Sequence, residues 1–254
     1  MNILIVKLSS LGDVVQTMPI VADILTEHPD AQIDWVVEEA FAPLVARVCG
    51  VRRVISIALR RWTKAWFSES TKQERSAFKK NLRAQTYDAV IDCQGLTKSA
   101  LVARLASLNQ HGLLGSFANK SDACGYEWPV KFLLPNNQVM PKRIHAITRT
   151  RLLAAKMLGY EVQGLPQAMF DALPAKVAVA KKVMFTHGTT RADNEWPFDD
   201  WNALAAHFIQ QGYHIVVPQA TEAEQRFAEL LSRQGIEQVH MLPRMNLSVL
   251  LDEM

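Results

Sequence analysis

The chain has 254 residues, of which 49% are hydrophobic and 21% are charged, and its formal net charge is +3. This composition predicts a folded globular protein, and the small net charge does not identify a partner by itself. The sequence has neither an apolar run near the ~20 residues that cross a bilayer nor the features of a signal peptide, so we expect a cytoplasmic protein. The cysteines at 49, 93 and 124 are widely spaced, which favours reduced thiols over a disulfide framework or a zinc site.

The first twenty residues predict a strand, a tight turn and a helix. Ile3 to Val6 form a short apolar run, typical of a parallel strand buried on both faces, and apolar residues at helical spacing continue to Glu27. Ligands bind at the carboxyl ends of the strands in open α/β sheets, so Ser10 and Asp13 are expected at a binding edge. Taken alone, Asp13 is also explained as a cap of the helix.

Strands and helices alternate through the first part of the chain. Further strands are expected at 33–37, 54–57, 87–92 and 111–114, and helices at 41–48, 72–84, 97–105 and 145–158. Most of 109–141 is expected to be irregular, Gly159 should end the last of these helices, and 160–180 should form a linker. This alternation predicts an α/β domain with a doubly wound parallel sheet over 1–165.

A second α/β series begins near residue 175. Strands are expected at 182–186, 213–217 and 238–242, and helices at 197–211, 222–234 and from 246 onward. The pattern stops within that last helix, and a parallel sheet of three strands would leave a bare edge. We therefore expect 175–254 to be an incomplete second domain and the chain to be a piece of a longer protein.

Neither series has a G-x-G-x-x-G turn after its first strand, which argues against a dinucleotide-dependent dehydrogenase. Several segments resemble instead the lipopolysaccharide heptosyltransferases of glycosyltransferase family 9. They are VKLSSLGDVVQTMP at 6–19, DWVVEE at 34–39, RRWTKAWF at 60–67, YDAVIDCQGLTKSA at 87–100, HAITRTR at 145–151, HGTTRADNEWP at 187–197 and LPRM at 242–245. The combination of RRW-x-KAWF with TTR-x-x-x-x-WP favours the heptosyltransferase I branch.

The resemblance implies the GT-B fold, in which two Rossmann-like domains face a cleft. It implies an inverting transfer of L-glycero-D-manno-heptose from ADP-heptose to the first Kdo of Kdo-lipid A, without a cofactor or a metal. The N-terminal domain would bind the acceptor and the C-terminal domain the nucleotide sugar. Asp13 would be the general base that takes the proton from the Kdo hydroxyl. The enzyme would work at the cytoplasmic face of the inner membrane and have no nucleic-acid partner.

On the donor side, the resemblance implies binding by Thr189, Thr190, Asn194, Glu224 and Met245. The threonines match residues that contact the diphosphate, Glu224 matches the glutamate that holds the ribose, and Met245 matches an adenine contact. Each also has a structural explanation, as a hydroxyl turn, a charged helix face or a core methionine. Asn194 stands where the family usually has lysine, and its neutral side chain cannot offset phosphate charge. The family's Asp-Thr-Gly-x-x-His element would lie beyond residue 254, so this chain alone is expected to have little activity.

On the acceptor side, Kdo carboxylates and lipid A phosphates require an anion-binding rim. The predicted rim residues are Ser10, Arg60, Arg61, Lys64, Lys98 and Arg149. Ordinary solvated charges are the alternative, although Arg60 and Arg61 follow a strand end directly. Trp62 and Trp66, beside these cations, fit either a membrane surface or the protein core.

Two other functions stay open. A non-catalytic GT-B binding module would retain the acceptor half, and Asn194 with the absent C-terminal element favours it. Another GT-B sugar-nucleotide enzyme, such as an epimerase, would need no anionic acceptor, so the basic rim argues against it.

Overall fold

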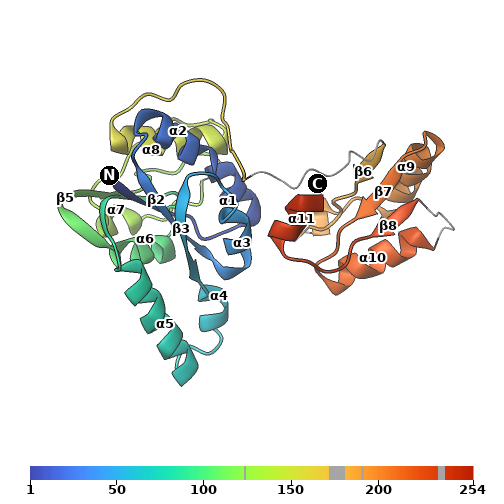
Figure 1. Ribbon diagram of the computed structural model, residues 1–254, viewed down its shortest axis with the longest axis horizontal. Coiled ribbons are helices and arrows are strands. Elements are labelled where there is room, and N and C mark those ends of the chain that lie inside the picture. The colour runs from blue at the N-terminus through green and yellow to red at the C-terminus, as the bar shows by residue number, and fades with distance from the viewer. Residues whose placement is uncertain (123, 172–180, 190–191, 234–237, 254) are drawn as a thin grey trace. The chain divides into compact units, whose positions relative to one another are not determined.

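The computed structural model describes residues 1–122, 124–171, 181–189, 192–233 and 238–253. The chain divides into two compact units, unit 1 (Met1–Asp171) and unit 2 (Ala172–Met254). Each unit contains a parallel β-sheet with helices packed on it (Figure 1). Within the described ranges, no helix combines the length and the apolar character needed to cross a membrane.

The sheet of unit 1 has five parallel strands in the order β3-β2-β1-β4-β5. They are β1 (Asn2–Val6), β2 (Gln32–Glu38), β3 (Val51–Ile57), β4 (Thr86–Asp92) and β5 (Ser107–Gly115). Leu4 and Val6 of β1 belong to a hydrophobic cluster that they form with helices on one face of the sheet. Ile3 and Ile5 do not belong to this cluster but are equally buried. Both faces of β1 are therefore covered, as its continuous apolar run predicts.

The helices of unit 1 pack on the sheet. They are α1 (Leu11–Thr17), α2 (Pro19–Glu27), α3 (Ala42–Val45), α4 (Leu59–Trp62), α5 (Glu69–Leu82), α6 (Thr97–Arg104), α7 (Val130–Leu133) and α8 (Ala146–Leu158), with a 3₁₀ turn at Glu39–Phe41. Side chains of α4, α5, α6 and α7 join Leu4 and Val6 in the cluster, whereas α8 packs on α1, α2 and β4. Gly159 ends α8 at a φ of 79°, as predicted.

The first predicted helix is in fact two helices. Proline has no backbone N–H and suits the first position of a helix, so Pro19 begins α2 instead of continuing α1. A second difference is α7, which lies inside the segment expected to be irregular.

Unit 2 has a smaller parallel sheet in the order β6-β7-β8. Its strands are β6 (Lys182–Met184), β7 (His214–Val217) and β8 (Val239–Met241), and its helices are α9 (Phe198–Gln210), α10 (Glu222–Ser232) and α11 (Leu247–Glu253), with a 3₁₀ turn at Ala192–Asn194. Phe185, Ala205, Ile215 and Leu231 form part of its buried core. The predicted alternation is confirmed, with each strand one or two residues shorter than expected.

Candidate active site

The turn between β1 and α1 holds the predicted base. Ser10 donates its backbone N–H and its hydroxyl to Oδ2 of Asp13, at 3.0 and 2.8 Å. Among the described residues, the Asp13 carboxylate accepts these two hydrogen bonds, and both reach the same oxygen. Asp13 thus stabilises the start of α1 while Oδ1 keeps its acceptor capacity. The two predicted roles, cap and base, are compatible.

The turn after β4 is tied to the turn after β1. The buried Gln94 side chain accepts hydrogen bonds from the N–H groups of Leu8 and Ser9, at 2.8 and 3.3 Å. Asp92 accepts from the N–H groups of Gln94 and Gly95, at 3.0 and 3.4 Å. Burial raises the pKa of Asp92 to about 6, although these hydrogen bonds oppose the shift. The loops on both sides of the site are therefore held by buried polar groups.

A pocket of about 180 Å³ lies where these two turns meet, and we call it the switch-point pocket. It is lined by Lys7, Ser9, Ser10, Asp13, Gln94, Leu96, Lys98, Gly125 and Arg149. Strand order reverses between β1 and β4, and this is the position where open α/β sheets bind ligands. The structure thus brings four predicted site residues, Ser10, Asp13, Lys98 and Arg149, around one pocket.

Two cations of the switch-point pocket are buried, since Lys7 is 5% exposed and Arg149 is 3% exposed. Lys7 Nζ donates to the carbonyl of Cys93 at 3.2 Å, and Arg149 Nη1 donates to the carbonyl of Asp122 at 2.7 Å. Burial lowers the pKa of Lys7, and the charge of Asp13 opposes this shift. Arg149 Nε is buried without a hydrogen-bond partner among the described residues. Such a site favours an anion that offsets the buried positive charge.

The predicted rim residues Arg60, Arg61 and Lys64 lie on α4 or just after it and do not line the switch-point pocket. The buried Glu38 carboxylate accepts the N–H groups of Leu59 and Arg60, at 3.1 and 2.8 Å. These bonds satisfy N–H groups at the start of α4 and fix the helix at the end of β2.

The charge of Arg61 is matched by two carboxylates, Glu39 at 3.1 Å and Glu74 at 2.8 Å. The indole N–H of Trp62 also donates to Glu74, at 2.6 Å, and Trp62 is 4% exposed. Trp66 is 39% exposed. Of the two alternatives for these tryptophans, Trp62 is therefore part of the core and Trp66 lies at the surface.

In unit 2, the predicted donor residues follow the carboxyl ends of the strands. Thr189 is exposed after β6, Asn194 is exposed in the 3₁₀ turn, Glu224 is in the first turn of α10, and Met245 is half-buried between β8 and α11. Thr190 lies outside the described residues. Parallel strands bring these segments to one edge of the sheet, which is consistent with a shared binding site.

Glu224 connects two turns of that edge. Its Oε2 accepts the N–H groups of Ala220 and Thr221, at 2.7 and 2.8 Å. A Cβ atom on Gly188 would lie 1.8 Å from Oε1, so the carboxylate lies against the backbone of the turn after β6. Burial alone would raise the pKa of Glu224, but the N–H groups and the charge of His187 lower it below its usual value. The carboxylate is therefore ionised at neutral pH.

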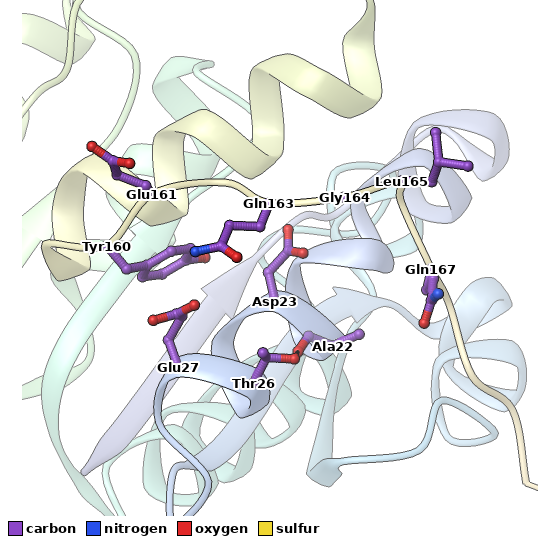
Figure 2. Close-up of a pocket in the computed structure, with 10 residues that line it drawn as sticks. All are labelled: Ala22, Asp23, Thr26, Glu27, Tyr160, Glu161, Gln163, Gly164, Leu165 and Gln167. Atoms are coloured by element: carbon purple, nitrogen blue, oxygen red, sulfur yellow. Dashed lines mark hydrogen bonds between the residues drawn. The ribbon is translucent and has the colours of Figure 1, made fainter.

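A second hollow, of about 320 Å³, contains none of the predicted site residues. Its lining comes from α2 and from the segment after α8 (Figure 2). Asp23, one of the three carboxylates in this lining, is paired with Arg151 at 2.7 Å. None of its lining residues follows the carboxyl end of a strand, so we do not assign it to the active site.

Lys7 and Gln94 are site residues that the sequence analysis did not predict. Both lie within two residues of the carboxyl end of a central strand, β1 or β4. Applying the strand-end rule to every polar residue of these turns would have found them.

Comparison with known proteins finds a matching family model and similar curated proteins. The family model described as glycosyltransferase family 9 (heptosyltransferase) matches residues 75–254. The chain is 41% identical over 255 residues to lipopolysaccharide heptosyltransferase 1 of Escherichia coli K12. This match covers 97% of this chain and 76% of the relative.

Solved structures of E. coli heptosyltransferase WaaC are also similar. The structure with ADP has a TM-score of 0.85 and 38% identity, and the match covers 100% of this chain and 78% of that chain. The structure with ADP-2-deoxy-2-fluoro heptose has a TM-score of 0.84 and 38% identity, with coverages of 100% and 79%.

The parallel sheets, the strand-end pocket and these similarities define a glycosyltransferase. More specifically, the chain belongs to glycosyltransferase family 9, the heptosyltransferases. The predicted resemblance to heptosyltransferase I and the predicted GT-B-type α/β fold are confirmed. The hypothesis of a non-catalytic binding module and that of another sugar-nucleotide enzyme are not favoured.

Proposed function

We propose that this chain transfers L-glycero-D-manno-heptose from ADP-heptose to the first Kdo of Kdo-lipid A, with inversion at the anomeric carbon. The similarity to lipopolysaccharide heptosyltransferase 1 and to a structure with an ADP-heptose analogue supports the reaction. The observation that carries the proposal is the meeting of Ser10, Asp13, Lys98 and Arg149 around the switch-point pocket. Residues 1–165 would bind the acceptor and residues 175–254 the nucleotide sugar.

In this proposal Asp13 is the general base. Its carboxylate takes the proton from the Kdo hydroxyl while that oxygen attacks the anomeric carbon of the heptose. The new C–O bond forms as the bond to the diphosphate breaks, and ADP leaves with the electron pair. The hydrogen bonds from Ser10 support the role because they hold Asp13 in one position.

The acceptor carboxylate would lie in the switch-point pocket. Lys7 and Arg149 are buried cations, and Lys98 is an exposed cation at the same pocket, so a carboxylate there gains charge-assisted hydrogen bonds. Arg60, Arg61 and Lys64 would contact more distant anionic groups of the acceptor. Because Arg61 already pairs with Glu39 and Glu74, we assign it the weakest role of these three.

The donor would bind at the strand-end edge of unit 2. Thr189 and Thr190 would contact the diphosphate, Glu224 the ribose and Met245 the adenine. The leaving diphosphate is anionic, so hydroxyl and backbone N–H donors must stabilise it. Asn194 is neutral and contributes no charge, which predicts weaker donor binding than a lysine would give.

We also propose that the protein works in the cytoplasm, in peripheral contact with the inner membrane. The proposed acceptor is a membrane lipid, and the exposed Trp66 lies in a region rich in basic residues.

The test is a transfer assay with a full-length version of the protein, ADP-heptose and Kdo-lipid A, with mass spectrometry of the product. We expect addition of one heptose, and Asp13→Asn should reduce kcat by about 10²- to 10⁴-fold. Asp30→Asn, which removes an exposed carboxylate in another turn, is the matched control. Failure of the full-length version to add heptose, or full activity of its Asp13→Asn variant, would contradict the proposal.

A further inference from the structure

Unit 1 has a larger pocket between α4, α5 and α6, with a volume of about 660 Å³. We call it the α5 pocket. Its apolar lining includes Trp62, Trp66, Phe78, Leu101 and Leu105. Leu101 is 51% exposed and Trp66 is 39% exposed, so apolar surface reaches the opening. The volume is in the range of small-molecule sites, and of the predicted acceptor residues only Lys98 lines this pocket.

The rim of the α5 pocket is cationic. Lys72, Arg75 and Lys79 of α5 line it at helical positions i, i+3 and i+7, which place them on one face of the helix. The Arg75 guanidinium lies 3.7 Å from the centre of the Trp66 ring. Lys72 has an exposed partner, Glu69, at 3.3 Å, and no carboxylate lines the pocket among the described residues. The α5 pocket therefore joins an apolar interior to a positively charged opening.

This combination selects an amphiphile with a negative head group. A nucleotide or a free sugar would leave polar groups without partners against Phe78 and Leu101, which costs free energy. An acyl chain has no such groups and gains about 0.8 kcal/mol for each methylene that it buries, a factor of about fourfold in affinity. A phosphate that follows directly on the chain would lie among the cations of α5.

We propose that the α5 pocket binds one acyl chain of an anionic membrane phospholipid. A phospholipid fits better than a glycolipid because only a glycerol separates its phosphate from its chains, so one molecule reaches both the apolar interior and Lys72, Arg75 and Lys79. Lys98 lines both the α5 pocket and the switch-point pocket. The bound lipid would therefore hold the protein at the membrane next to the acceptor site. The inference rests on the membrane contact proposed above.

The first experiment uses soluble probes and does not depend on transferase activity. Alkyl phosphates of six to twelve carbons, kept monomeric, are titrated into the protein by calorimetry, with alkyl maltosides of equal chain length as neutral probes. Affinity should rise by up to about fourfold per methylene until the pocket is full. The maltosides should bind about tenfold more weakly, because they lack the charge-assisted contacts. Affinity that does not depend on chain length would overturn the proposal.

Two variants form the matched pair for that titration. Leu101→Glu places a carboxylate at the opening of the α5 pocket, whereas Leu230→Glu makes the same change on α10, at a leucine of similar exposure, 49% against 51%. Decyl phosphate should bind Leu101→Glu at least about tenfold more weakly and bind Leu230→Glu normally. Circular dichroism of both variants checks that they fold. Equal affinity of the two variants would contradict the assigned position.

The second experiment distinguishes whether the bound acyl chain comes from a phospholipid or from the acceptor. Flotation with phosphatidylcholine vesicles, with and without phosphatidylglycerol and without any acceptor, measures membrane binding. Binding should require the anionic lipid, and brominated chains should quench fluorescence less in Trp66→Phe than in the unmodified protein. Binding that occurs only when Kdo-lipid A is present would assign the chain to the acceptor and overturn the proposal. Loss of the proposed transferase function would change neither readout.

Discussion

Ser10 directs both of its hydrogen-bond donors at one atom of Asp13, with its N–H 3.0 Å and its hydroxyl 2.8 Å from Oδ2. This geometry predicts that the structural and chemical roles of Asp13 can be separated. In Asp13→Asn the side-chain carbonyl still accepts from Ser10, so the free energy of unfolding should fall by no more than about 1 kcal/mol. The measured kcat should nevertheless fall sharply, because an amide does not take the proton. Asp13→Leu should lose both the hydrogen bonds from Ser10 and the transferase activity. Similar unfolding curves for Asp13→Asn and Asp13→Leu would contradict this separation of the two roles.

We predict that a change at Lys7 affects binding of the acceptor and not of the donor. Lys7→Met removes the buried charge and keeps most of the side-chain volume, so KM for the acceptor should rise by about 10- to 100-fold. KM for ADP-heptose should not change. Stability should stay the same or increase, because burial of the ammonium group opposes its charge. Lys156→Met is the control, since Lys156 also donates to a carbonyl, that of Val139, but is exposed on α8. An equal effect of both changes would argue against an anion site at Lys7.

We predict that a change at Gly188 affects binding of the donor and not of the acceptor. Alanine there would place Cβ 1.8 Å from Glu224 Oε1, so the carboxylate must move. Gly188→Ala and Glu224→Gln should each weaken ADP binding by about 10- to 100-fold in calorimetry, the range expected when one hydrogen bond to a charged group is lost. Glu222→Gln, an exposed position in the same helical turn, should bind normally. Normal binding by Glu224→Gln would remove this residue from the donor site.

Asn194 predicts a gain of function. Asn194→Lys adds a positive charge in the exposed 3₁₀ turn after β6, near the proposed diphosphate site. Donor affinity should rise by about tenfold at low ionic strength, and the gain should shrink as salt is added. Asn194→Gln is the uncharged control of similar length. If glutamine gives the same gain as lysine, charge is not the cause.

Asp92 predicts a defined dependence of stability on pH. Burial raises its pKa to about 6, whereas an unfolded aspartate has a pKa of about 3.9, so the folded state binds the proton more tightly. Its contribution to stability is therefore fully present below about pH 4 and is lost as the pH rises through about 6. Denaturation of the unmodified protein and of Asp92→Asn from pH 4 to 7 should show a difference that changes by roughly 2–3 kcal/mol. A constant difference would contradict the raised pKa.

Local patterns predicted most elements, and the exceptions have physical causes. The strand expected at 54–57 begins at Val51 because Arg52 and Arg53 pair with the buried Asp34 of β2, at 2.9 and 2.8 Å. An apolar-run criterion ends at such charges, since it does not detect the partner on the neighbouring strand. The first helix was predicted as continuous because Pro19 falls within an unbroken apolar period.

By itself the sequence determined the alternation of strands with the longer helices, the placement of Ser10 and Asp13 after the first strand, and the family. These properties depend on side-chain periodicity and short motifs, which are local. Only the tertiary structure decided that Lys7, Gln94 and Arg149 meet at one pocket, and that Arg61 is already paired with two carboxylates. The physical reason is strand order. β4 pairs with β1 although the paired residues, such as Ile3 and Ala89, are more than 80 positions apart in the sequence, and long-range packing of the sheet sets this pairing.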